Sequence, residues 1–544
     1  MTQDRMTEWW QHGVVYQVYI RSFADGNGDS EGDLTGLRSR LDYLAELGVD
    51  AIWINPWYAS PMRDGGYDVA DYRNIDPRFG SVDEAELFIA EAHERGIRVI
   101  ADLVPNHTSS DHAWFQEALA AEPGSPARDR YIFRKGKGPN GDQPPTNWTA
   151  VFGGSTWERV DDGEWYLHIF DTSQPDLNWE NPEVRAEFEE IFRFWLDRGI
   201  DGFRVDVAHG LVKDPAYPDT ATAGGILEIE GLDTDEPVDH PHWDRDGVHE
   251  IIRSWRSILN EYEDRMMVAE AWVHAKRLPL YLRPDEYHQS FNFDLLEAAW
   301  TAESFRSIVT KSLDAASAIG ATSTWVLSNH DVVRHATRYG LPEDFPWRSW
   351  INGDADPEAL DMALGTKRAR AAALITLSLP GSTYVYQGEE LGLHEVWDLP
   401  EEVLDDPTWE RSEHTARGRD GCRVPIPWTT TGPSFGFGPG EPWLPQPERF
   451  GAVSAEAQQG DPHSMLSLYK AAIAARREHF ATDLRLTIRD LGDDVLAWDR
   501  GDNVLVVANM GSEAVNLPEG TVLVSSAPID GALLEPDTAA WIQV

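Results

Sequence analysis

The chain of 544 residues exceeds what one compact hydrophobic core normally holds, so we expect it to divide into two or three domains. Hydrophobic residues make up 41% of the chain, which is enough for a large packed interior and argues against disorder. The formal net charge of −47 excludes nucleic acid and anionic membrane surfaces as partners, because the field of the protein repels both.

Strand and helix patterns alternate at the start of the chain. Strands are predicted at 14–20, 51–55 and 97–104, and helices lie between them at 37–47 and 84–96. This order favours parallel strands that are joined by right-handed crossovers.

The alternation is interrupted over residues 105–178. This stretch is rich in Gly, Pro, Asp and Trp, and its one convincing helix lies around 113–121. Because it is too long for a loop of a compact domain, we predict an inserted subdomain. A helix at 183–198 then restores the pattern.

The second half of the chain completes a set of eight predicted strands. Four of them lie at 202–207, 267–272, 322–329 and 382–388, and the segment 290–296 leads out of another. Eight alternating strands predict an α/β fold, a (β/α)₈ TIM barrel with an insertion after its third strand.

The last barrel helix is predicted at 464–479, and short alternating segments follow it to the end of the chain. They indicate a small C-terminal antiparallel β-domain. The predicted divisions are 1–104 and 179–480 for the barrel, 105–178 for the inserted subdomain and 481–544 for the β-domain.

Charged side chains stand at the ends of three of the barrel strands: Arg204, Asp206, Glu270, His330 and Asp331. Packing does not explain them, because strand interiors favour β-branched and aromatic residues. A TIM barrel carries its chemistry at the carboxyl ends of its strands. Three carboxylates with an Arg and a His suit cleavage of a glycosidic bond, and the alternative is an ion-pair network without catalysis.

Asp206 and Glu270 follow neighbouring strands of the predicted barrel. Their carboxyl groups can therefore meet at the ~5–5.5 Å that retaining glycosidases use. Arg204 shares a strand face with Asp206, because residues i and i+2 of a strand point the same way. We expect Arg204 to hold Asp206 ionised, as a nucleophile requires.

Several segments resemble the α-amylase family of retaining glycoside hydrolases. Four resemble its conserved segments, in the family's order: DLVPNH (102–107), GFRVDVAH (202–209), VAEAW (268–272) and LSNHD (327–331). The segment QPDLNWENP (174–182) resembles a fifth, in the form found in oligo-1,6-glucosidases and maltase-type α-glucosidases. Two more similar segments are YQVYIRSF (16–23) and YVYQGEELG (384–392).

The resemblance implies a role for each charged residue. Asp206 matches the nucleophile, Glu270 the general acid/base, and Asp331 the third carboxylate, which grips hydroxyl groups of the sugar. Sugar-binding positions of the family match Arg204, His107 and His330. For either histidine, simple burial in the core is the alternative.

RDGGYD (63–68) resembles the segment that closes the non-reducing side of the sugar pocket in exo-acting members. The resemblance implies that Tyr67 stacks on glucose and that Asp64 binds its 4-hydroxyl group beside an Arg partner. That partner matches Arg419, with Arg423 as the second choice, and the alternative is an ordinary surface ion pair.

Three further positions match residues of the sugar pocket in these relatives. Phe152 and Phe170 match aromatic residues that line it, and Val207 follows the nucleophile. In close relatives Val at that position accompanies α-1,6 activity and Thr accompanies α-1,4 activity. The segment after Glu270 departs from the oligo-1,6-glucosidase pattern, so linkage preference stays open.

The loop DGNGDSEGD (25–33) alternates oxygen-bearing residues with glycine, as calcium loops do. The resemblance implies one structural Ca²⁺ or Mg²⁺ ion here, remote from catalysis. Its expected ligands are Asp25, Asn27, Asp29, the carbonyl of Glu31, and Asp33. A hydrated turn without metal is the alternative.

These observations predict an exo-acting retaining α-glucosidase that releases glucose from short maltose- or isomaltose-type oligosaccharides and also transfers glucose to other sugars. The alternatives are a trehalose synthase, a sucrose isomerase or a sucrose hydrolase, and a non-catalytic carbohydrate-binding or transporter-associated barrel. The N-terminus lacks a signal-peptide pattern and the chain has one cysteine, so we expect a cytoplasmic monomer or small homo-oligomer without membrane partners.

Overall fold

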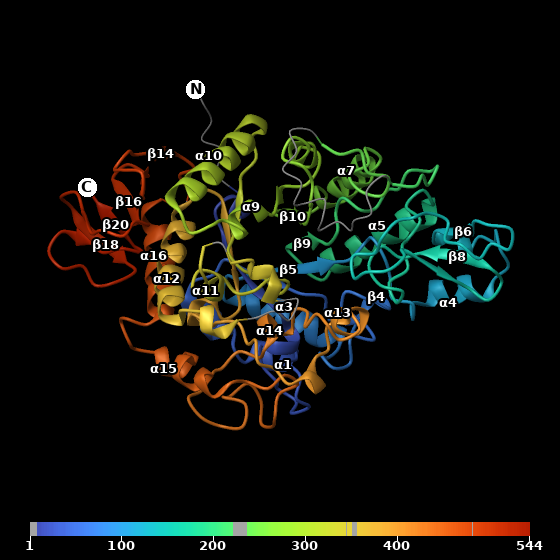
Figure 1. Cartoon of the computed structure of the whole chain (residues 1–544), viewed down its shortest axis with the longest axis horizontal. Coiled ribbons are helices and arrows are strands. Elements are labelled where there is room, and N and C mark those ends of the chain that lie inside the picture. Colours follow the sequence, from blue (N-terminus) through green and yellow to red (C-terminus); the bar gives the residue numbers. More distant parts are fainter. Residues whose placement is uncertain (1–7, 221–236, 344, 351–355, 481) are drawn as a thin grey trace.

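The computed structural model describes residues 8–220, 237–343, 345–350, 356–480 and 482–544 (Figure 1). Eight parallel strands form the central sheet: β1 Val14–Val18, β2 Ala51–Ile54, β5 Arg98–Leu103, β9 Gly202–Val205, β10 Met266–Ala269, β11 Gln289–Ser290, β12 Thr324–Val326 and β13 Ser382–Tyr386. Their order is β11-β10-β9-β5-β2-β1-β13-β12. This arrangement confirms the predicted (β/α)₈ barrel.

Side chains close the barrel between its terminal strands, β11 and β12. Thr324 Oγ1 donates to the Ser290 carbonyl at 2.8 Å and accepts from the Asn292 amide at 3.1 Å. Gln289 Nε2 donates to Thr322 Oγ1 at 3.1 Å. The sixth strand therefore ends at Ser290, where the predicted exit segment 290–296 begins, and this segment contains the short helix α9, Phe293–Leu296.

Helices surround the barrel: α3 Val82–Glu94, α5 Pro182–Leu196, α7 Val248–Leu259, α8 Leu278–Tyr281, α10 Ala302–Ile319, α12 Met362–Ser378 and α16 Met465–His479. Helix α5 shows how the sequence sets an end, because Asn181 caps it and Pro182 occupies its first turn. The helix predicted at 37–47 is two helices, α1 Leu34–Arg38 and α2 Leu41–Leu47. The Ser39 hydroxyl donates to the Gly36 carbonyl and thereby closes α1.

The predicted insertion contains helix α4, Ala113–Ala120, and three antiparallel strands in the order β6-β8-β7. These strands are β6 Phe133–Lys135, β7 Trp157–Arg159 and β8 Glu164–Leu167. A separate hairpin of β3 Tyr58–Ala59 and β4 Asp71–Ile75 leaves the barrel after β2.

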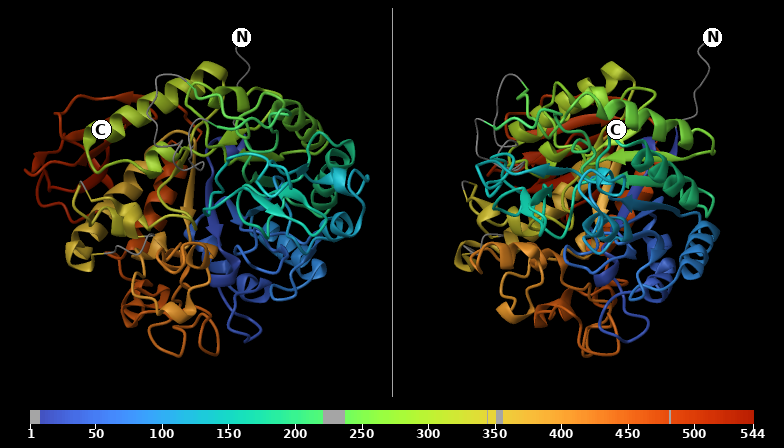
Figure 2. Two further views of the ribbon diagram at one scale, coloured as in Figure 1. Left: turned by 45° about the vertical axis from the view of Figure 1, so that its right-hand side comes forward. Right: turned by 90° about the vertical axis from the view of Figure 1, so that its right-hand side faces the viewer.

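The C-terminal region forms the predicted antiparallel sheet. Its strands, in the order β14-β15-β16-β20-β18, are β14 Leu486–Ile488, β15 Val495–Arg500, β16 Val504–Asn509, β20 Thr538–Gln543 and β18 Thr521–Ser525. Trp498 and Trp541 fix this sheet to α12, because their indole nitrogens donate to Ser378 Oγ and to the Leu374 carbonyl. The sheet and the inserted subdomain lie at opposite ends of the molecule (Figures 1 and 2).

Two details of the C-terminal sheet differ from the sequence patterns. The segment around Val515 pairs only with β19, Leu533–Leu534, outside the main sheet, and β14 carries no clear alternation. Among the described residues, no helix is long and apolar enough to cross a membrane.

Candidate active site

The predicted site residues gather at the carboxyl ends of the barrel strands. Asp206 and Glu270 directly follow β9 and β10, while His330 and Asp331 follow β12. The loop between β3 and β4 brings Asp64 and Tyr67 to the same place. Two short helices after β13 complete the pocket: α13 Pro407–Arg411 and α14 Asp420–Arg423.

One guanidinium group joins three carboxylates at the centre of the pocket. Arg204 Nη1 donates to Asp206 Oδ1 at 2.5 Å and to Asp102 Oδ1 at 2.9 Å. Its Nη2 lies 2.9 Å from Glu270 Oε2. We call Arg204, Asp102, Asp206 and Glu270 the Arg204 cluster.

Burial and the charge of Arg204 act in opposite directions on the pKa of Asp206. Burial raises the pKa of Asp206 well above its usual range, and Glu270 and Asp102 add to this, against the opposing charge of Arg204. Burial likewise raises the pKa of Asp102 to about 6, although Arg204 and Tyr67 lower it. One guanidinium charge is thus shared among three buried carboxylates, which limits how far Arg204 can lower the pKa of each. The ionised state of Asp206 stays a prediction.

A second group of three carboxylates surrounds Arg419. Arg419 donates from Nη2 to Asp64 Oδ1 at 2.8 Å, from Nη1 to Asp331 Oδ1 at 2.9 Å, and from Nε to Asp406 Oδ2 at 2.5 Å. Arg423 Nη2 also donates to Asp331 Oδ1, at 3.0 Å. We call these five residues the Arg419 cluster. The structure thus pairs Asp64 with Arg419, the first of the two candidates.

In the Arg419 cluster, the pKa values of two of the three carboxyl groups are lowered. Removal from water opposes the charge on Asp331, yet His330, Arg419 and Arg423 together lower its pKa well below the usual range. The same balance lowers the pKa of Asp406 beside Arg419 and Arg423. Burial dominates only for Asp64, whose pKa is raised. Asp331 therefore keeps its negative charge in this pocket.

His330 is held as a neutral donor at the floor of the pocket. Its Nδ1 lies 2.8 Å from Gln17 Nε2, which can only donate, so the ring proton resides on Nε2. That nitrogen is 3.1 Å from Asp331 Oδ2, and burial lowers the pKa of His330 well below its usual value. The ring of Tyr67 stacks on His330 at 5.3 Å with planes 6° apart.

His107 and the two phenylalanines line the side of the inserted subdomain. His107 Nε2 is 3.1 Å from the Tyr67 carbonyl, and burial lowers the pKa of this histidine to about 4. Phe170 packs 5.1 Å from His107 and 6.2 Å from Phe152, while the guanidinium of Arg419 lies 5.3 Å from the Phe152 ring. The predicted pocket residues are therefore neighbours in space.

Val207 adopts a left-handed backbone conformation with φ of 46°, which a β-branched side chain rarely takes. This conformation turns its amide toward Glu270, and Val207 N donates to Glu270 Oε2 at 3.0 Å. Strained backbone of this kind is typical of functional sites. Val207 thus orients the carboxyl group of Glu270 through its main chain.

The loop predicted to bind metal is closed by hydrogen bonds of its own. Carboxylate oxygens of Asp25, Asp29 and Asp33 accept amide protons of Gly28, Glu31 and Asn27. Within the described residues, no group of three or more His, Cys, Asp or Glu side chains is arranged to hold a metal ion. The calcium or magnesium site stays a prediction.

Sequence reasoning missed several residues of the pocket. Asp102 stands at the end of β5 within a quoted segment, and it accepts from Tyr67 and Trp53 as well as from Arg204. Gln174, also in a quoted segment, donates to Asp64 Oδ2 at 2.9 Å. The same strand-end signal could have identified Asp102.

Comparison with known proteins agrees with this geometry. The catalytic-domain model of the α-amylase family matches residues 17–483. The chain belongs to this family.

Three similar proteins illustrate the relationship. The oligo-1,6-glucosidase of Parageobacillus thermoglucosidasius is 36% identical over 504 residues, covering 87% of this chain and 84% of that protein. A probable alpha-glucosidase of Rhizobium meliloti (strain 1021) is 36% identical over 486 residues, covering 86% and 83%. The crystal structure of the alpha-glucosyl transfer enzyme XgtA superposes with a TM-score of 0.84 at 33% identity, covering 99% of this chain and 100% of that one.

Proposed function

We propose that this protein is an exo-acting, retaining α-glucosidase that removes glucose from the non-reducing ends of short α-linked gluco-oligosaccharides. The observation that carries the proposal is the geometry of the Arg204 cluster, in which Asp206 Oδ1 and Glu270 Oε2 lie 2.5 Å and 2.9 Å from the same guanidinium group. Retaining hydrolysis requires two neighbouring carboxyl groups of this kind, since one must donate a proton and the other must attack. The names of the two similar glucosidases support the same substrate class.

The reaction follows from the residues of the Arg204 cluster. Asp206 attacks the anomeric carbon while Glu270 gives its proton to the departing glycosidic oxygen, so the C–O bond breaks and a β-glucosyl ester forms. Glu270, now ionised, then takes a proton from water as the water oxygen attacks the same carbon. Asp206 leaves and α-glucose is released, with the proton back on Glu270. Two inversions give net retention.

The Arg419 cluster supplies the exo character. The hydrogen-bonded pair of Asp64 and Arg419 fills the space beyond the terminal sugar, and Phe152 lies against the guanidinium group. A longer chain threading past this sugar would have to occupy the volume of that pair. Asp331, charged and beside His330, is suited to grip two vicinal hydroxyl groups.

Transfer to a sugar acceptor instead of water is the second candidate function, and the similarity to an alpha-glucosyl transfer enzyme favours it. The preferred linkage is open between α-1,4 and α-1,6, and the presence of Val207 favours α-1,6. Incubation with maltose, isomaltose, sucrose and trehalose, followed by product identification, tests the proposal. Release of glucose that is lost in Asp206→Asn supports hydrolysis. Isomerised disaccharides without glucose release would support the alternative.

We further propose one structural Ca²⁺ or Mg²⁺ ion in the 25–33 loop, supported by the oxygen-rich side chains of that loop and by the family resemblance. A cytoplasmic location is supported by the single cysteine, Cys422, which is buried and needs no oxidising compartment. We propose a monomer or small homo-oligomer whose partner is its oligosaccharide substrate.

A further inference from the structure

Trp272 contacts the proposed acid/base from the loop that follows β10. Its indole Nε1 donates to Glu270 Oε1 at 3.2 Å. The other carboxyl oxygen of Glu270 is held by the Val207 amide at 3.0 Å and lies 2.9 Å from Arg204 Nη2. Both oxygens of Glu270 are therefore engaged, and Trp272 donates to the oxygen opposite the one that the Val207 amide holds.

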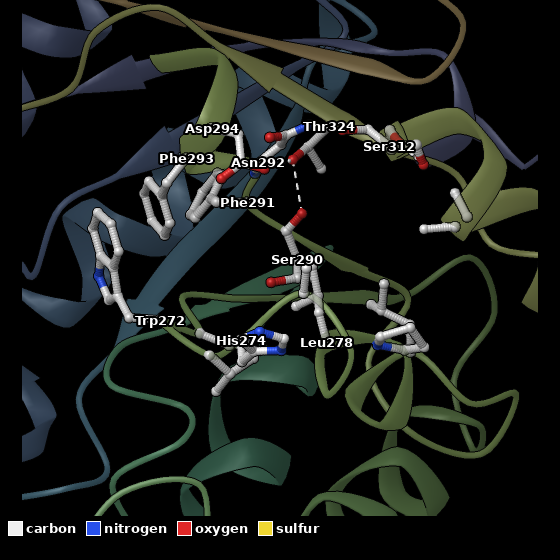
Figure 3. A pocket seen from close by; sticks show the side chains of 18 of the residues that line it. Trp272, His274, Leu278, Ser290, Phe291, Asn292, Phe293, Asp294, Ser312 and Thr324 are labelled. Carbon is white, nitrogen blue, oxygen red and sulfur yellow. Dashed lines mark hydrogen bonds between the residues drawn. The ribbon is translucent and has the colours of Figure 1, made fainter. Parts of the chain in front are cut away.

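The indole of Trp272 is itself fixed by a neighbouring ring. The ring of Phe293 stacks on it with centroids 3.6 Å apart and planes 4° apart (Figure 3). Phe293 is the first residue of α9, and Asn292 caps that helix while its Nδ2 donates to Ser312 Oγ of α10. Phe293 is thus anchored to the barrel wall and sets the plane of the indole.

A cavity of about 510 Å³ lies on one side of the ring pair, and Trp272 and Phe293 stand together at its edge (Figure 3). His274, Leu278, Ser290 and Asn292 are among its other lining residues. On this side the indole therefore borders the cavity and is not enclosed by core side chains. Its orientation is set by the stack with Phe293, by the hydrogen bond to Glu270 and by packing against the buried cluster that contains Val207 and Trp243.

We propose that Trp272, backed by Phe293, is a positioning residue for Glu270 that aids proton delivery to the departing sugar. This inference rests on the proposed function. After Glu270 has given its proton to the glycosidic oxygen it is a carboxylate, and an N–H donor stabilises that charged product. The same bond fixes the orientation of the carboxyl group before the transfer, which matters because proton donors must be aligned.

Leaving groups distinguish this role from simple packing. A disaccharide releases a poor leaving group that must be protonated, whereas α-glucosyl fluoride releases fluoride with little help from an acid. Trp272→Phe keeps a ring on Phe293 and removes the N–H. We expect its kcat/KM to fall about tenfold for the better of maltose and isomaltose, and less than about twofold for α-glucosyl fluoride.

A second readout is the pH profile of kcat/KM for the disaccharide. Loss of an N–H donor disfavours the ionised acid, so the alkaline limb of the Trp272→Phe profile should move to higher pH. Phe293→Leu retains the N–H but frees the indole, and it should show the same selective loss on the disaccharide. This variant carries the test if Trp272→Phe does not fold.

Trp541→Phe is the matched control, because it removes an indole hydrogen bond of 3.1 Å in the C-terminal sheet. It should change kcat/KM for the disaccharide and for α-glucosyl fluoride by the same factor. Equal losses on the disaccharide and on α-glucosyl fluoride in Trp272→Phe, or no loss on either, would overturn the positioning role. A folded wild-type protein that cleaves neither substrate would instead contradict the proposed function, and this result is seen before any variant is compared.

Discussion

The pocket contains two groups of three carboxylates that differ in how many guanidinium groups they share. The Arg204 cluster places Asp102, Asp206 and Glu270 around one guanidinium. In the Arg419 cluster, Asp64, Asp331 and Asp406 share Arg419 with Arg423. The two groups differ in the ratio of opposite charges and also in exposure, because the Asp331 side chain is 31% exposed and those of Asp102, Asp206 and Glu270 are 0%, 8% and 14% exposed.

The pKa shifts of the carboxyl groups follow this ratio except at Asp64, whose pKa is raised by burial. In the Arg204 cluster burial wins and the pKa values of Asp206 and Asp102 are raised. Burial is outweighed at Asp331 by His330, Arg419 and Arg423, and at Asp406 by Arg419 and Arg423, so the pKa values of both are lowered. The first cluster is thus suited to moving protons and the second to holding hydroxyl groups with fixed charge.

The largest effects are expected in the Arg204 cluster. Asp206→Asn removes the nucleophile and Glu270→Gln removes the proton donor, so each should fold normally and lose at least ~10²–10⁴-fold in kcat. The measurement is steady-state hydrolysis of p-nitrophenyl α-glucoside, with melting curves as the control for folding. If either variant kept more than about a tenth of wild-type activity, its assigned role would be wrong.

Asp64→Ala tests the Arg419 cluster and should have a smaller effect. It removes a hydrogen bond to the terminal sugar and leaves Arg419 with one partner fewer, so kcat/KM for maltose-like substrates should fall by about 10- to 150-fold. Initial rates over a range of substrate concentrations check this. A loss of kcat/KM as large as that of Asp206→Asn would contradict the separate roles of the two clusters.

The pH dependence of stability separates the two clusters directly. The pKa of Asp102 is raised to about 6, so its protonated form stabilises the fold at low pH, and this contribution is lost as pH rises through about 6. Asp102→Asn should therefore lose less stability than the wild type between about pH 4 and about pH 8. Melting temperatures of both proteins at the two pH values provide the measurement.

Asp331→Asn is the contrasting variant in this experiment. The pKa of Asp331 is lower in the folded protein than in the unfolded chain. Its contribution to the free energy of unfolding is therefore fully present above the pKa of the unfolded chain, and it is lost as pH falls through the lower pKa of the folded protein. Between about pH 5 and about pH 8 its stability difference from the wild type should stay constant. A pH-dependent difference for Asp331→Asn, or none for Asp102→Asn, would contradict the charge-ratio explanation.

Metal removal should leave both clusters intact and has the smallest expected effect on catalysis. A chelator should lower the melting temperature while kcat at moderate temperature changes little, because an ion that binds only the native state stabilises it by mass action. Asp29→Ala, a change at an exposed loop position, should abolish the chelator's effect. An unchanged melting curve, or loss of catalysis without a change in melting, would exclude a structural ion.

Much of this pocket could be predicted from sequence because strand ends carry a simple signal. Asp206 and Glu270 follow apolar runs on consecutive parallel strands, and the carboxyl ends of such strands meet. Asp406 had no such signal, since it lies in the irregular 396–428 segment and reaches Arg419 only through the tertiary fold. Asp102 contacts Arg204 from about a hundred positions away in the sequence. Local spacing therefore could not reveal that Asp206 and Asp102 share Arg204.

The most direct test of the account is the identity of the first product released from maltoheptaose, or from isomaltoheptaose if the enzyme cleaves only α-1,6 bonds. A pocket closed by Asp64 and Arg419 with a retaining Arg204 cluster predicts glucose as the first product, cut from the non-reducing end and initially in the α form by proton NMR. Reducing-end labelling should leave the label on the shortened oligosaccharide. Products from maltose to maltopentaose at the start, or glucose released initially as the β form, would contradict the account.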